Sequence, residues 1–484
     1  MNLETTPVHS AALLAAVLTP TIGAFLLPVA GRVSKGLRNA LAVCLVGAAF
    51  AACMILLPAV LGGLEPEVRL ARGFILRADM LAVFMALVSS FVSTVIALYS
   101  TSYISHYEYQ DEYYTMVVLF LGAMMGLVFS GHLLLLFVFW EITAITSWRL
   151  IGFFREKAYV LKADKAFLVT ALGALAMLLG FISLYAERGT FDLATLAQHP
   201  AIGGGVLCLI MLGILSKSAT LPLHTWLPDA GVAPSPVTAL LHAAVLVKIG
   251  VYVYARLFVV TFNPGIEWQT VVLAVAAASA LVSAGAALVD NDMKRIIAYS
   301  TVSQIAFIFL GLAAGGAVGV AGALLYILMH GLAKGGLFLC AGIIEHNTHT
   351  KDIRQMGGLA RTMPVTAVAF LCCALSVMGI PPFGGFFAKY MVVSGGIQAG
   401  HVGLTCVFVA GAVMTILYLF RLFNAIFMGE EKMPRVKEGS VLMVACVALL
   451  AALSLAGGIA ICGPASCAMK AAQQMLSGMH GAMP

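Results

Sequence analysis

Residues 215–229 read Leu-Ser-Lys-Ser-Ala-Thr-Leu-Pro-Leu-His-Thr-Trp-Leu-Pro-Asp, and residues 378–389 read Met-Gly-Ile-Pro-Pro-Phe-Gly-Gly-Phe-Phe-Ala-Lys. Each stretch sets a lysine, Lys217 or Lys389, beside prolines within a long apolar run. Proline removes a backbone hydrogen bond and clashes with the preceding helical turn, so each stretch should interrupt a helix. Paired interruptions in corresponding parts of a chain are typical of inverted-repeat membrane transporters. The two stretches therefore predict the fold around them.

The rest of the chain is also apolar. Of its 484 residues, 62% are hydrophobic and 10% are charged, whereas soluble domains carry about 25% charged residues. A membrane span needs about 20 apolar residues, and in lipid such a segment must be helical. The sequence therefore predicts an all-α polytopic membrane protein, and its formal charge of +6 gives no indication of nucleic acid as a partner. We count fourteen candidate spans, at residues 8–30, 37–61, 79–102, 115–131, 132–153, 165–187, 203–227, 235–260, 270–289, 293–314, 318–345, 363–396, 402–428 and 440–463.

The candidate spans divide the chain into four parts. Residues 1–114 hold helices 1 to 3, and residues 429–484 hold the last helix and a tail. Between them we predict two inverted five-helix repeats, at 115–260 and 270–428, whose broken members are helices 7 and 12. This division follows from the pattern of interruptions, since the residue-level similarity between the repeats is faint.

The connecting segments alternate in charge. Of the 27 lysines and arginines, four lie inside spans and 17 follow odd-numbered spans. Basic residues concentrate on the cytoplasmic side of membrane proteins, so both termini are predicted to lie outside. The six basic residues assigned to the opposite side are Arg69, Arg72, Arg77, Arg188, Arg256 and Lys470.

Five charged residues fall within predicted spans. A charge at the bilayer centre costs at least about 2.5–3.5 kcal/mol, so five isolated charges would cost well over roughly 10 kcal/mol. They must therefore face one another, water, or a polar path through the bundle. These residues are Glu141, Lys217, Lys248, Lys334 and Lys389.

Glu141 and Lys217 are the candidates for a central proton switch. Burial disfavours the charged form of either group, whereas a nearby opposite charge favours it. A Glu–Lys pair whose spacing changes would therefore hold both charges when paired and let the lysine release its proton when parted. The alternative is a static buried salt bridge.

Further residues extend the predicted path. Lys248 would take the proton onward, and Lys389 would be the exit in the second repeat; the alternative for both is a lysine that snorkels to the interface. His330 and Lys334 are four residues apart on one helix face, and histidine can relay protons near neutral pH. A structural histidine is the alternative for His330.

Three residues are candidates for supporting roles. His224 and Asp229 flank Trp226 where the seventh span ends, and they would either gate or cap that end. His242 lies six residues before Lys248, which puts it on a different face of an α-helix and makes it the weaker candidate.

Several motifs together carry a resemblance. They are Ser-Lys-Ser-Ala (216–219) with Pro-Leu-His-Thr-Trp-Leu-Pro-Asp-Ala (222–230), Ala-Pro-Ser-Pro-Val-Thr-Ala-Leu-Leu-His (233–242), Asp-Met-Lys-Arg-Ile-Ile-Ala-Tyr-Ser-Thr-Val-Ser-Gln (292–304) and His-Gly-Leu-Ala-Lys-Gly-Gly-Leu-Phe (330–338). In combination they resemble the proton-translocating antiporter-like subunits of respiratory complex I, Mrp sodium/proton antiporters and membrane-bound hydrogenases. Residues 139–147 and 342–359 are most similar to the large A subunit of Mrp antiporters, or to the complex I subunit most like it.

The resemblance covers about residues 75–430 and implies a fold of fourteen helices with inverted repeats. Arg149 departs from the family pattern, since an apolar residue usually stands there; it would tune Glu141 or snorkel. By this resemblance, Glu141 and Lys217 match the family's acid–lysine pair, Lys248 its connecting lysine, His330 and Lys334 its linking pair, and Lys389 its terminal lysine.

The expected function is translocation of protons, with sodium as a further candidate ion, within a multi-subunit Mrp-type, hydrogenase or complex I-like assembly of other membrane subunits. We expect the chain in a bacterial or archaeal cytoplasmic (inner) membrane. No flavin, haem, quinone or iron–sulfur motif and no metal-ligand spacing appears, so no cofactor or metal is predicted for this chain. Whether it serves an enzyme, such as an NADH:quinone oxidoreductase-like complex, stays open. The alternatives are a stand-alone secondary transporter and a non-conducting structural subunit.

Overall fold

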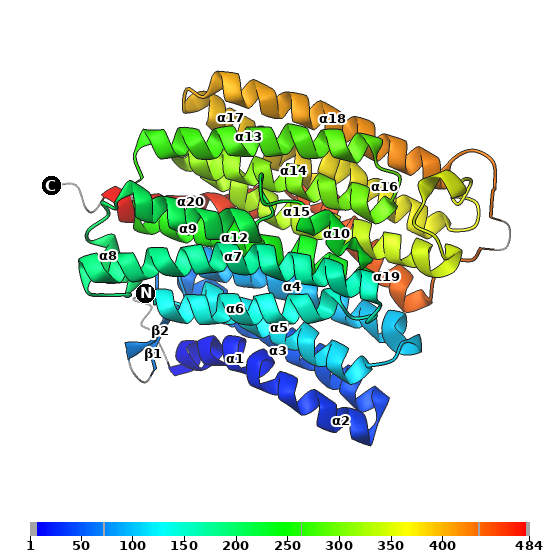
Figure 1. Ribbon diagram of the computed structural model, residues 1–484, viewed down its shortest axis with the longest axis horizontal. Helices are drawn as coiled ribbons and strands as arrows, with labels where there is room; N and C mark the ends of the chain where they lie inside the picture. Colours follow the sequence, from blue (N-terminus) through cyan, green and yellow to red (C-terminus); the bar gives the residue numbers. More distant parts are fainter. Residues whose placement is uncertain (1–6, 71–72, 263, 434–435, 481–484) are drawn as a thin grey trace.

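The computed structural model describes residues 7–70, 73–262, 264–433 and 436–480. Arg72, which entered the charge count above, lies outside these ranges, as do Arg435 and both chain ends, whose predicted placement outside the membrane is therefore not described. The chain forms a bundle of long helices that run in roughly the same direction, accompanied by one small hairpin (Figure 1).

The helices, in chain order, are α1 (Pro7–Gly23), η1 (Ala24–Leu26), α2 (Leu27–Val33), α3 (Lys35–Leu61), α4 (Met80–Tyr103), η3 (Ile104–His106), α5 (Gln110–Val128), α6 (Leu133–Ile151), α7 (Lys157–Arg188), α8 (Leu193–Ala197), α9 (Gly204–Lys217), α10 (Trp226–Asp229), η4 (Ala230–Val232), α11 (Ser235–Ala239), η5 (Leu240–Ala244), α12 (Leu246–Tyr254), η6 (Ala255–Thr261), α13 (Ile266–Val289), α14 (Met293–Ala314), α15 (Gly316–Thr348), η7 (Ile353–Gln355), α16 (Pro364–Met378), α17 (Gly384–Gln398), α18 (Val402–Phe427), α19 (Val441–Ile459) and α20 (Cys462–His480). Of these, η5 and η6 are π-helical and the other η elements are 3₁₀ turns.

The predicted all-α polytopic class is confirmed. Within the described ranges, 12 helical segments are long and apolar enough to cross a membrane, judged by length and composition. The two remaining predicted spans, 203–227 and 363–396, are interrupted where the prolines stand: α9 ends at Lys217, and α16 and α17 are separated by residues 379–383. The count of fourteen membrane crossings and the inverted repeats stay predictions.

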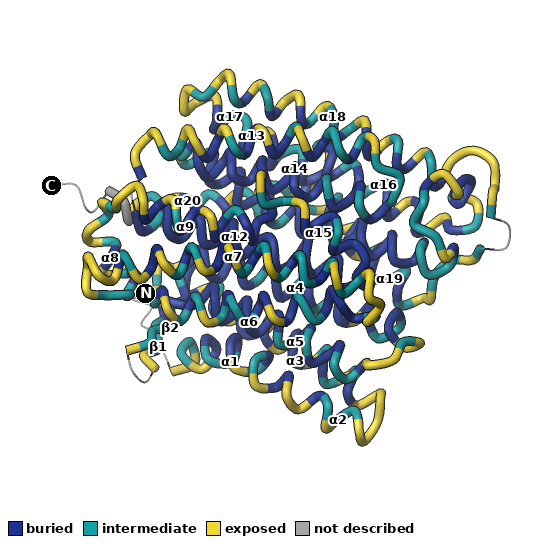
Figure 2. Tube along the Cα trace, viewed as in Figure 1, coloured by how far each residue is buried: buried dark blue, intermediate teal, exposed yellow. Residues whose placement is uncertain are grey.

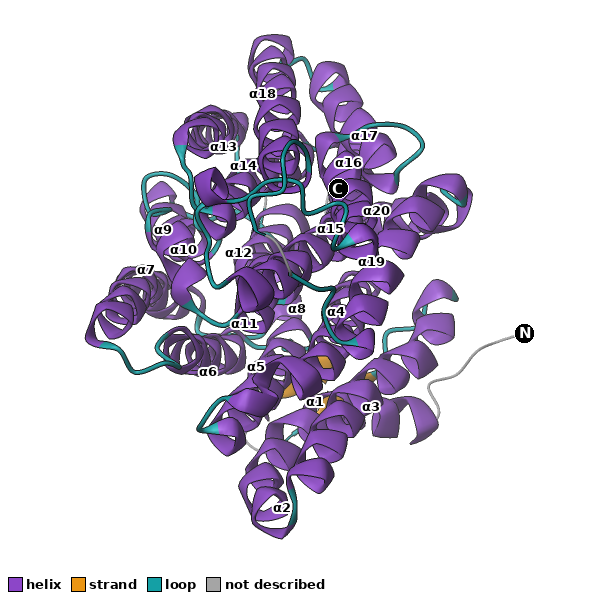
Figure 3. Cartoon of the chain, turned by 90° about the vertical axis from the view of Figure 1, so that its right-hand side faces the viewer, coloured by secondary structure: helices purple, strands orange, loops and turns teal. Residues whose placement is uncertain are grey.

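The most buried helices run through the middle of the bundle. Viewed along the bundle, α13, α14 and α16–α18 lie on one side, α1–α3 lie on the other, and α12 and α15 lie between them (Figure 3). α15 packs against α14, α16, α17, α19 and α20, and its residues are almost all buried (Figure 2). Buried polar side chains on α12 and α15 are therefore shielded from the bundle surface.

Side chains and glycines fix several helix ends. The Asp79 carboxylate accepts a hydrogen bond from the Ala82 amide at 2.9 Å and so caps α4, and Asp292 caps α14 through the Arg295 amide at 3.1 Å. Gly315 separates α14 from α15 at φ 74°, a conformation that glycine adopts at little cost. These signals end long helices at fixed points and so set which residues face the core.

The hairpin joins β1 (Glu67–Arg69) to β2 (Ile75–Arg77), with Glu67 opposite Arg77 in antiparallel register. It lies with α8 at one end of the bundle, at the left of Figure 1, which we call the hairpin end. The assignment of Arg256 to a connecting segment at this end was wrong. Arg256 is buried within η6, because the helix continues past it to Thr261.

Candidate functional site

The four lysines predicted inside the membrane share one kind of contact. Each is buried, and each ammonium donates to a main-chain carbonyl. Within the described chain none of the four has a carboxylate within 4.0 Å, so a carbonyl stands in the place of an acid, joined at Lys248 by a histidine ring. The donor–acceptor pairs are Lys217 Nζ with Trp140 O at 3.3 Å, Lys248 Nζ with His242 O at 2.9 Å, Lys334 Nζ with Ile297 O at 3.0 Å, and Lys389 Nζ with Val377 O at 2.8 Å.

Lys217 is the last residue of α9, where the first interruption begins. Its ammonium lies 5.2 Å from the centroid of the Trp140 ring, on α6. Glu141, the next residue of α6, interacts with Lys217 electrostatically, but the two form no ion pair within 4.0 Å. The Oε1 atom of Glu141 is buried without a hydrogen-bond partner. The structure therefore holds the two groups near each other in the parted arrangement, with a carbonyl in place of the carboxylate.

Lys248 and His330 are in direct contact, although 82 residues separate them in the chain. Lys248 Nζ lies 2.6 Å from His330 Nδ1, and the same ammonium donates to the carbonyl of His242. That carbonyl is available because residues 240–244 form a π-helical turn, a feature that often marks functional sites in helices. Both ring nitrogens of His242 are buried without a partner, and its ring packs on Phe338 at 4.4 Å.

Lys334 lies one turn beyond His330 on α15, and Lys389 lies on α17 after the second interruption. Lys334 interacts electrostatically with both Lys248 and Lys389. The Lys389 ammonium lies 4.7 Å from the Phe307 ring centroid and 5.7 Å from that of Tyr326. The predicted path residues of the second repeat therefore belong to one buried cluster with Lys248.

The supporting candidates lie further from the lysines. Asp229 accepts from Lys165 and Arg295, each at 2.7 Å; burial alone would raise the pKa of its carboxyl, but these two hydrogen bonds lower it overall. His224 lies in the first interruption, and its Nδ1 atom is buried without a hydrogen-bond partner. Arg149 pairs with Glu112 on α5 and makes no ion pair with Glu141.

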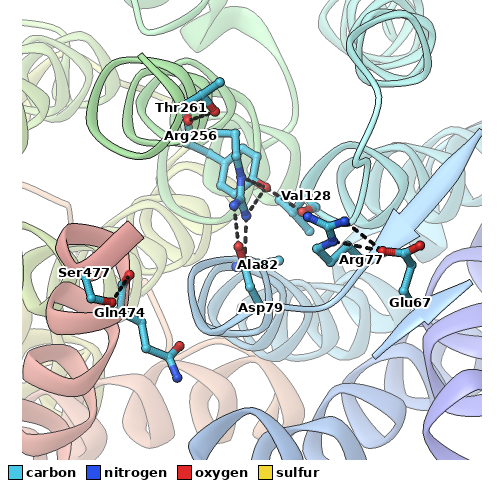
Figure 4. Close-up of polar contacts among 10 residues, drawn as sticks. Glu67, Arg77, Asp79, Ala82, Val128, Arg256, Thr261, Gln474 and Ser477 are labelled. Atoms are coloured by element: carbon cyan, nitrogen blue, oxygen red, sulfur yellow. Dashed lines mark hydrogen bonds and ion pairs between the residues drawn. The ribbon is translucent and has the colours of Figure 1, made fainter. Parts of the chain in front are cut away.

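The sequence reading missed two buried ion pairs. Lys294, taken as a boundary residue, is buried and lies 2.6 Å from Glu345 at the end of α15. Arg256 pairs with Asp79, the residue that caps α4 (Figure 4). A four-residue spacing could have revealed Arg256, because Lys248, Tyr252 and Arg256 recur along one helix face.

The described residues contain no group of three or more His, Cys, Asp or Glu side chains that could hold a metal ion. What they do contain is a set of buried basic groups, spread over α9, α12, α15 and α17 and joined by direct or electrostatic contacts. Such a set can hold and pass protons, since lysine and histidine each bind one reversibly.

Residues 130–415 match the family model described as NADH:quinone oxidoreductase/Mrp antiporter, transmembrane, and this match covers more than half of the chain. The chain belongs to this family. The matched region of this antiporter-like family includes both helix interruptions and the four lysines predicted inside spans. The predicted resemblance is therefore confirmed at the level of the family.

Sequence relatives support this family assignment. The chain is 36% identical over 392 residues to the A subunit of the Na(+)/H(+) antiporter of Alkalihalophilus pseudofirmus, a match to 74% of this chain and 48% of that protein. It thus spans about half the length of the curated relatives that it matches.

Solved structures share the fold. A chain of the Mrp complex from Dietzia superposes with a TM-score of 0.90 at 24% identity, covering 99% of both chains. A chain of the archaeal membrane-bound sulfane sulfur reductase, a respiratory membrane complex, superposes with a TM-score of 0.91 at 25% identity, covering 98% of this chain and 100% of that chain. The chain is accordingly a multi-pass membrane protein.

Proposed function

We propose that this chain moves protons across the membrane as one component of a multi-subunit assembly of the Mrp or respiratory type. The carrying observation is that four lysines, on α9, α12, α15 and α17, are buried and donate to main-chain carbonyls, with no carboxylate of the described residues within 4.0 Å. Its curated relatives are named as A subunits of Na(+)/H(+) antiporters, which supports this function and makes sodium a further candidate ion.

In the proposed mechanism, protons enter toward Lys217 and Lys248, pass His330 and Lys334, and leave at Lys389. Glu141 controls when Lys217 releases its proton. Approach of the Glu141 carboxylate would favour the charged form of Lys217, and its withdrawal would favour release of a proton. His224, Asp229, His242 and Arg149 would support the path without carrying the proton. The repeats at 115–260 and 270–428 would each supply one interrupted helix.

The proposal includes a location. We place the chain in a bacterial or archaeal cytoplasmic membrane, with the hairpin end and both termini outside, because most basic residues follow odd-numbered spans. Other membrane subunits of an Mrp-type, hydrogenase or complex I-like assembly would be its partners. The structural neighbours come from an Mrp complex and from a respiratory membrane complex, which supports partners of this kind.

Replacing Lys217 tests the function. In the assembled complex, reconstituted in vesicles, Lys217→Ala should abolish proton transport, and Lys217→Arg should do so too, because an arginine side chain does not release its proton. Transport is measured with a pH-sensitive dye and divided by the amount of assembled complex. Lys157→Ala, at an exposed position at the start of α7, is the control that should transport normally. Normal transport by Lys217→Ala would refute the proposal.

A further inference from the structure

A cavity opens at the hairpin end of the bundle, away from the four lysines. Its volume is about 160 Å³, which is room for about ten water molecules. Its wall brings together the segment before α4, the end of η6 and the C-terminal helix α20, as Figure 4 shows. The residues of the wall that matter here are Glu65, Arg77, Asp79, Arg256, Thr261 and Gln474.

A row of side chains runs along the helix from this cavity toward Lys248. Lys248, Tyr252 and Arg256 follow each other at intervals of four residues along α12 and η6, so neighbours in the row are about 6 Å apart along the helix. The Tyr252 hydroxyl donates to the Val128 carbonyl at 2.5 Å and accepts from Arg256 Nε at 3.0 Å. Lys248, at the far end of the row, contacts His330.

Arg256 lies where this row meets the cavity. Its guanidinium is buried and donates to both oxygens of Asp79, with Nη2–Oδ1 at 2.8 Å. A lone arginine in a narrow passage repels protons and other cations. Asp79 neutralises that charge, so the ion pair decides whether a cation meets a barrier at this point.

Among the residues that the structure describes, Glu65, at the mouth of the cavity, forms no ion pair within 4.0 Å. Arg77, its neighbour in the wall, forms an ion pair with Glu67 at 2.8 Å, and Arg256 forms one with Asp79. Partial burial and the nearby Asp79 carboxylate raise the pKa of Glu65. An exposed carboxyl of this kind exchanges protons with outside water more readily near neutral pH than an ordinary glutamate.

We propose that this cavity is the mouth through which protons from the hairpin-end water reach Lys248, with Glu65 as the exchanging acid and the Asp79–Arg256 pair as the gate. The inference rests on the proposed function and adds an entrance to it. A proton binds the Glu65 carboxylate, passes to cavity water, crosses the Asp79–Arg256 pair and is taken up by the neutral amine of Lys248. The Tyr252 hydroxyl donates to Val128 O and accepts from Arg256, so it positions the guanidinium and does not carry the proton. Arg256 keeps its proton throughout, and its positive charge acts only as the barrier.

Single and double substitutions of the gate distinguish this role from a structural one. Asp79→Asn leaves the arginine charge uncompensated and should lower proton transport per assembled complex about tenfold, since about 1.4 kcal/mol of added barrier has that effect. The double variant with Asp79→Asn and Arg256→Gln removes both the positive charge and the carboxylate that neutralises it. Its proton transport per assembled complex should be within about threefold of that of the parent. Arg69→Gln, an exposed partner of Glu67 outside the cavity wall, is the matched control.

A second measurement covers the case in which the gate variants fail to assemble. Gln474 lies in the cavity wall, whereas Ser477 lies one turn further along α20 and outside it (Figure 4). A membrane-impermeant thiol reagent, added from the hairpin side only, should lower transport by Gln474→Cys well below that of the untreated variant. Ser477→Cys and the parent chain, treated in the same way, should keep their rates.

The possible outcomes separate this inference from the proposed function. If Lys217→Ala abolishes transport while the gate variants and the Gln474→Cys adduct transport normally, the entrance is overturned and the function stands. If Lys217→Ala itself transports normally, the function fails, whatever the cavity does. Equal losses for Gln474→Cys and Ser477→Cys would also overturn the entrance, because they would show that the reagent acts elsewhere.

Discussion

At the scale of single residues, the contact that matters is between an ammonium and a carbonyl. A carboxylate partner forms a stronger hydrogen bond with a lysine than a neutral carbonyl does. The four lysines predicted inside spans donate to carbonyls, and Glu141, the one acid predicted among them, stays out of ion-pair distance of Lys217. Lys294, in contrast, pairs with Glu345. A lysine that donates to a carbonyl loses less hydrogen-bond energy on deprotonation than one that donates to a carboxylate. Such a lysine is therefore better suited to passing a proton on than to retaining it.

His330 is the residue that joins the two halves of the proposed path. It contacts Lys248 at 2.6 Å and shares α15 with Lys334. Removing this relay with His330→Ala should lower proton transport about 100-fold, the usual contribution of a positioned proton carrier. The measurement is dye-monitored proton uptake, divided by the amount of assembled complex.

His199→Ala is the matched control, because the His199 side chain is exposed and no described contact joins it to the four lysines. A purely structural role for His330 would lower the yield of the complex and leave the rate per complex unchanged.

At the scale of elements, breaks in helices supply two of the four carbonyls, those of Val377 and His242, whereas Trp140 and Ile297 lie within the regular helices α6 and α14. Where α9 and α16 end, the last turns have carbonyls without helical partners. Trp226 Nε1 donates to Ser216 O at 3.0 Å, and Lys389 donates to Val377 O, so a side chain satisfies the broken end in each case. The π-helical turn in the eighth predicted span does the same for Lys248. The break after α16 thus serves Lys389 and the π-helical turn serves Lys248, whereas the broken end of α9 is satisfied by Trp226.

The second interruption is also the most closely packed. A Cβ atom on Gly385, in the first turn of α17, would overlap the carbonyl oxygen of Ser376 on α16. We therefore expect Gly385→Ala to lower the melting temperature of the purified complex, since overpacking of this kind costs about 1–3 kcal/mol. Thermal unfolding followed by intrinsic fluorescence is the measurement.

Gly403, on α18, is the control, because a Cβ atom added there would meet no other atom within 4 Å. Gly403→Ala should therefore leave the melting temperature unchanged. An unchanged melting temperature for Gly385→Ala would mean that α16 and α17 separate more easily than their contact implies.

At the scale of the whole molecule, much of the surface is apolar. α7 alone exposes Leu168, Leu172, Leu175 and Leu179, at intervals of three and four residues that place them on one face. Lipid or a neighbouring membrane protein would cover such a face. The chain also spans about half the length of its curated relatives, which leaves the composition of the assembly to be found by experiment.

Gentle extraction of the complex from its own membrane, followed by identification of its subunits, tests the proposed partners. We expect further membrane subunits to copurify with this chain. Small Mrp-type subunits without redox proteins would identify a sodium/proton antiporter, and hydrogenase or quinone-reductase subunits would identify the pumping arm of a redox complex. A chain that is isolated alone and is active alone would contradict the assembly and favour a stand-alone transporter.

The sequence by itself determined the membrane class, the family, the two interruptions beside Lys217 and Lys389, and four of the buried lysines; it missed Lys294. These follow from composition, proline and local spacing, which act within one or two helical turns. Only the tertiary structure decided the partner of each charge. The contact of Lys248 with His330, the carbonyl beside Lys217, and the pairs Asp79–Arg256 and Lys294–Glu345 join helices far apart in the chain. The π-helical turn before Lys248 also changes which groups share a face, and α-helical spacing does not predict such a turn.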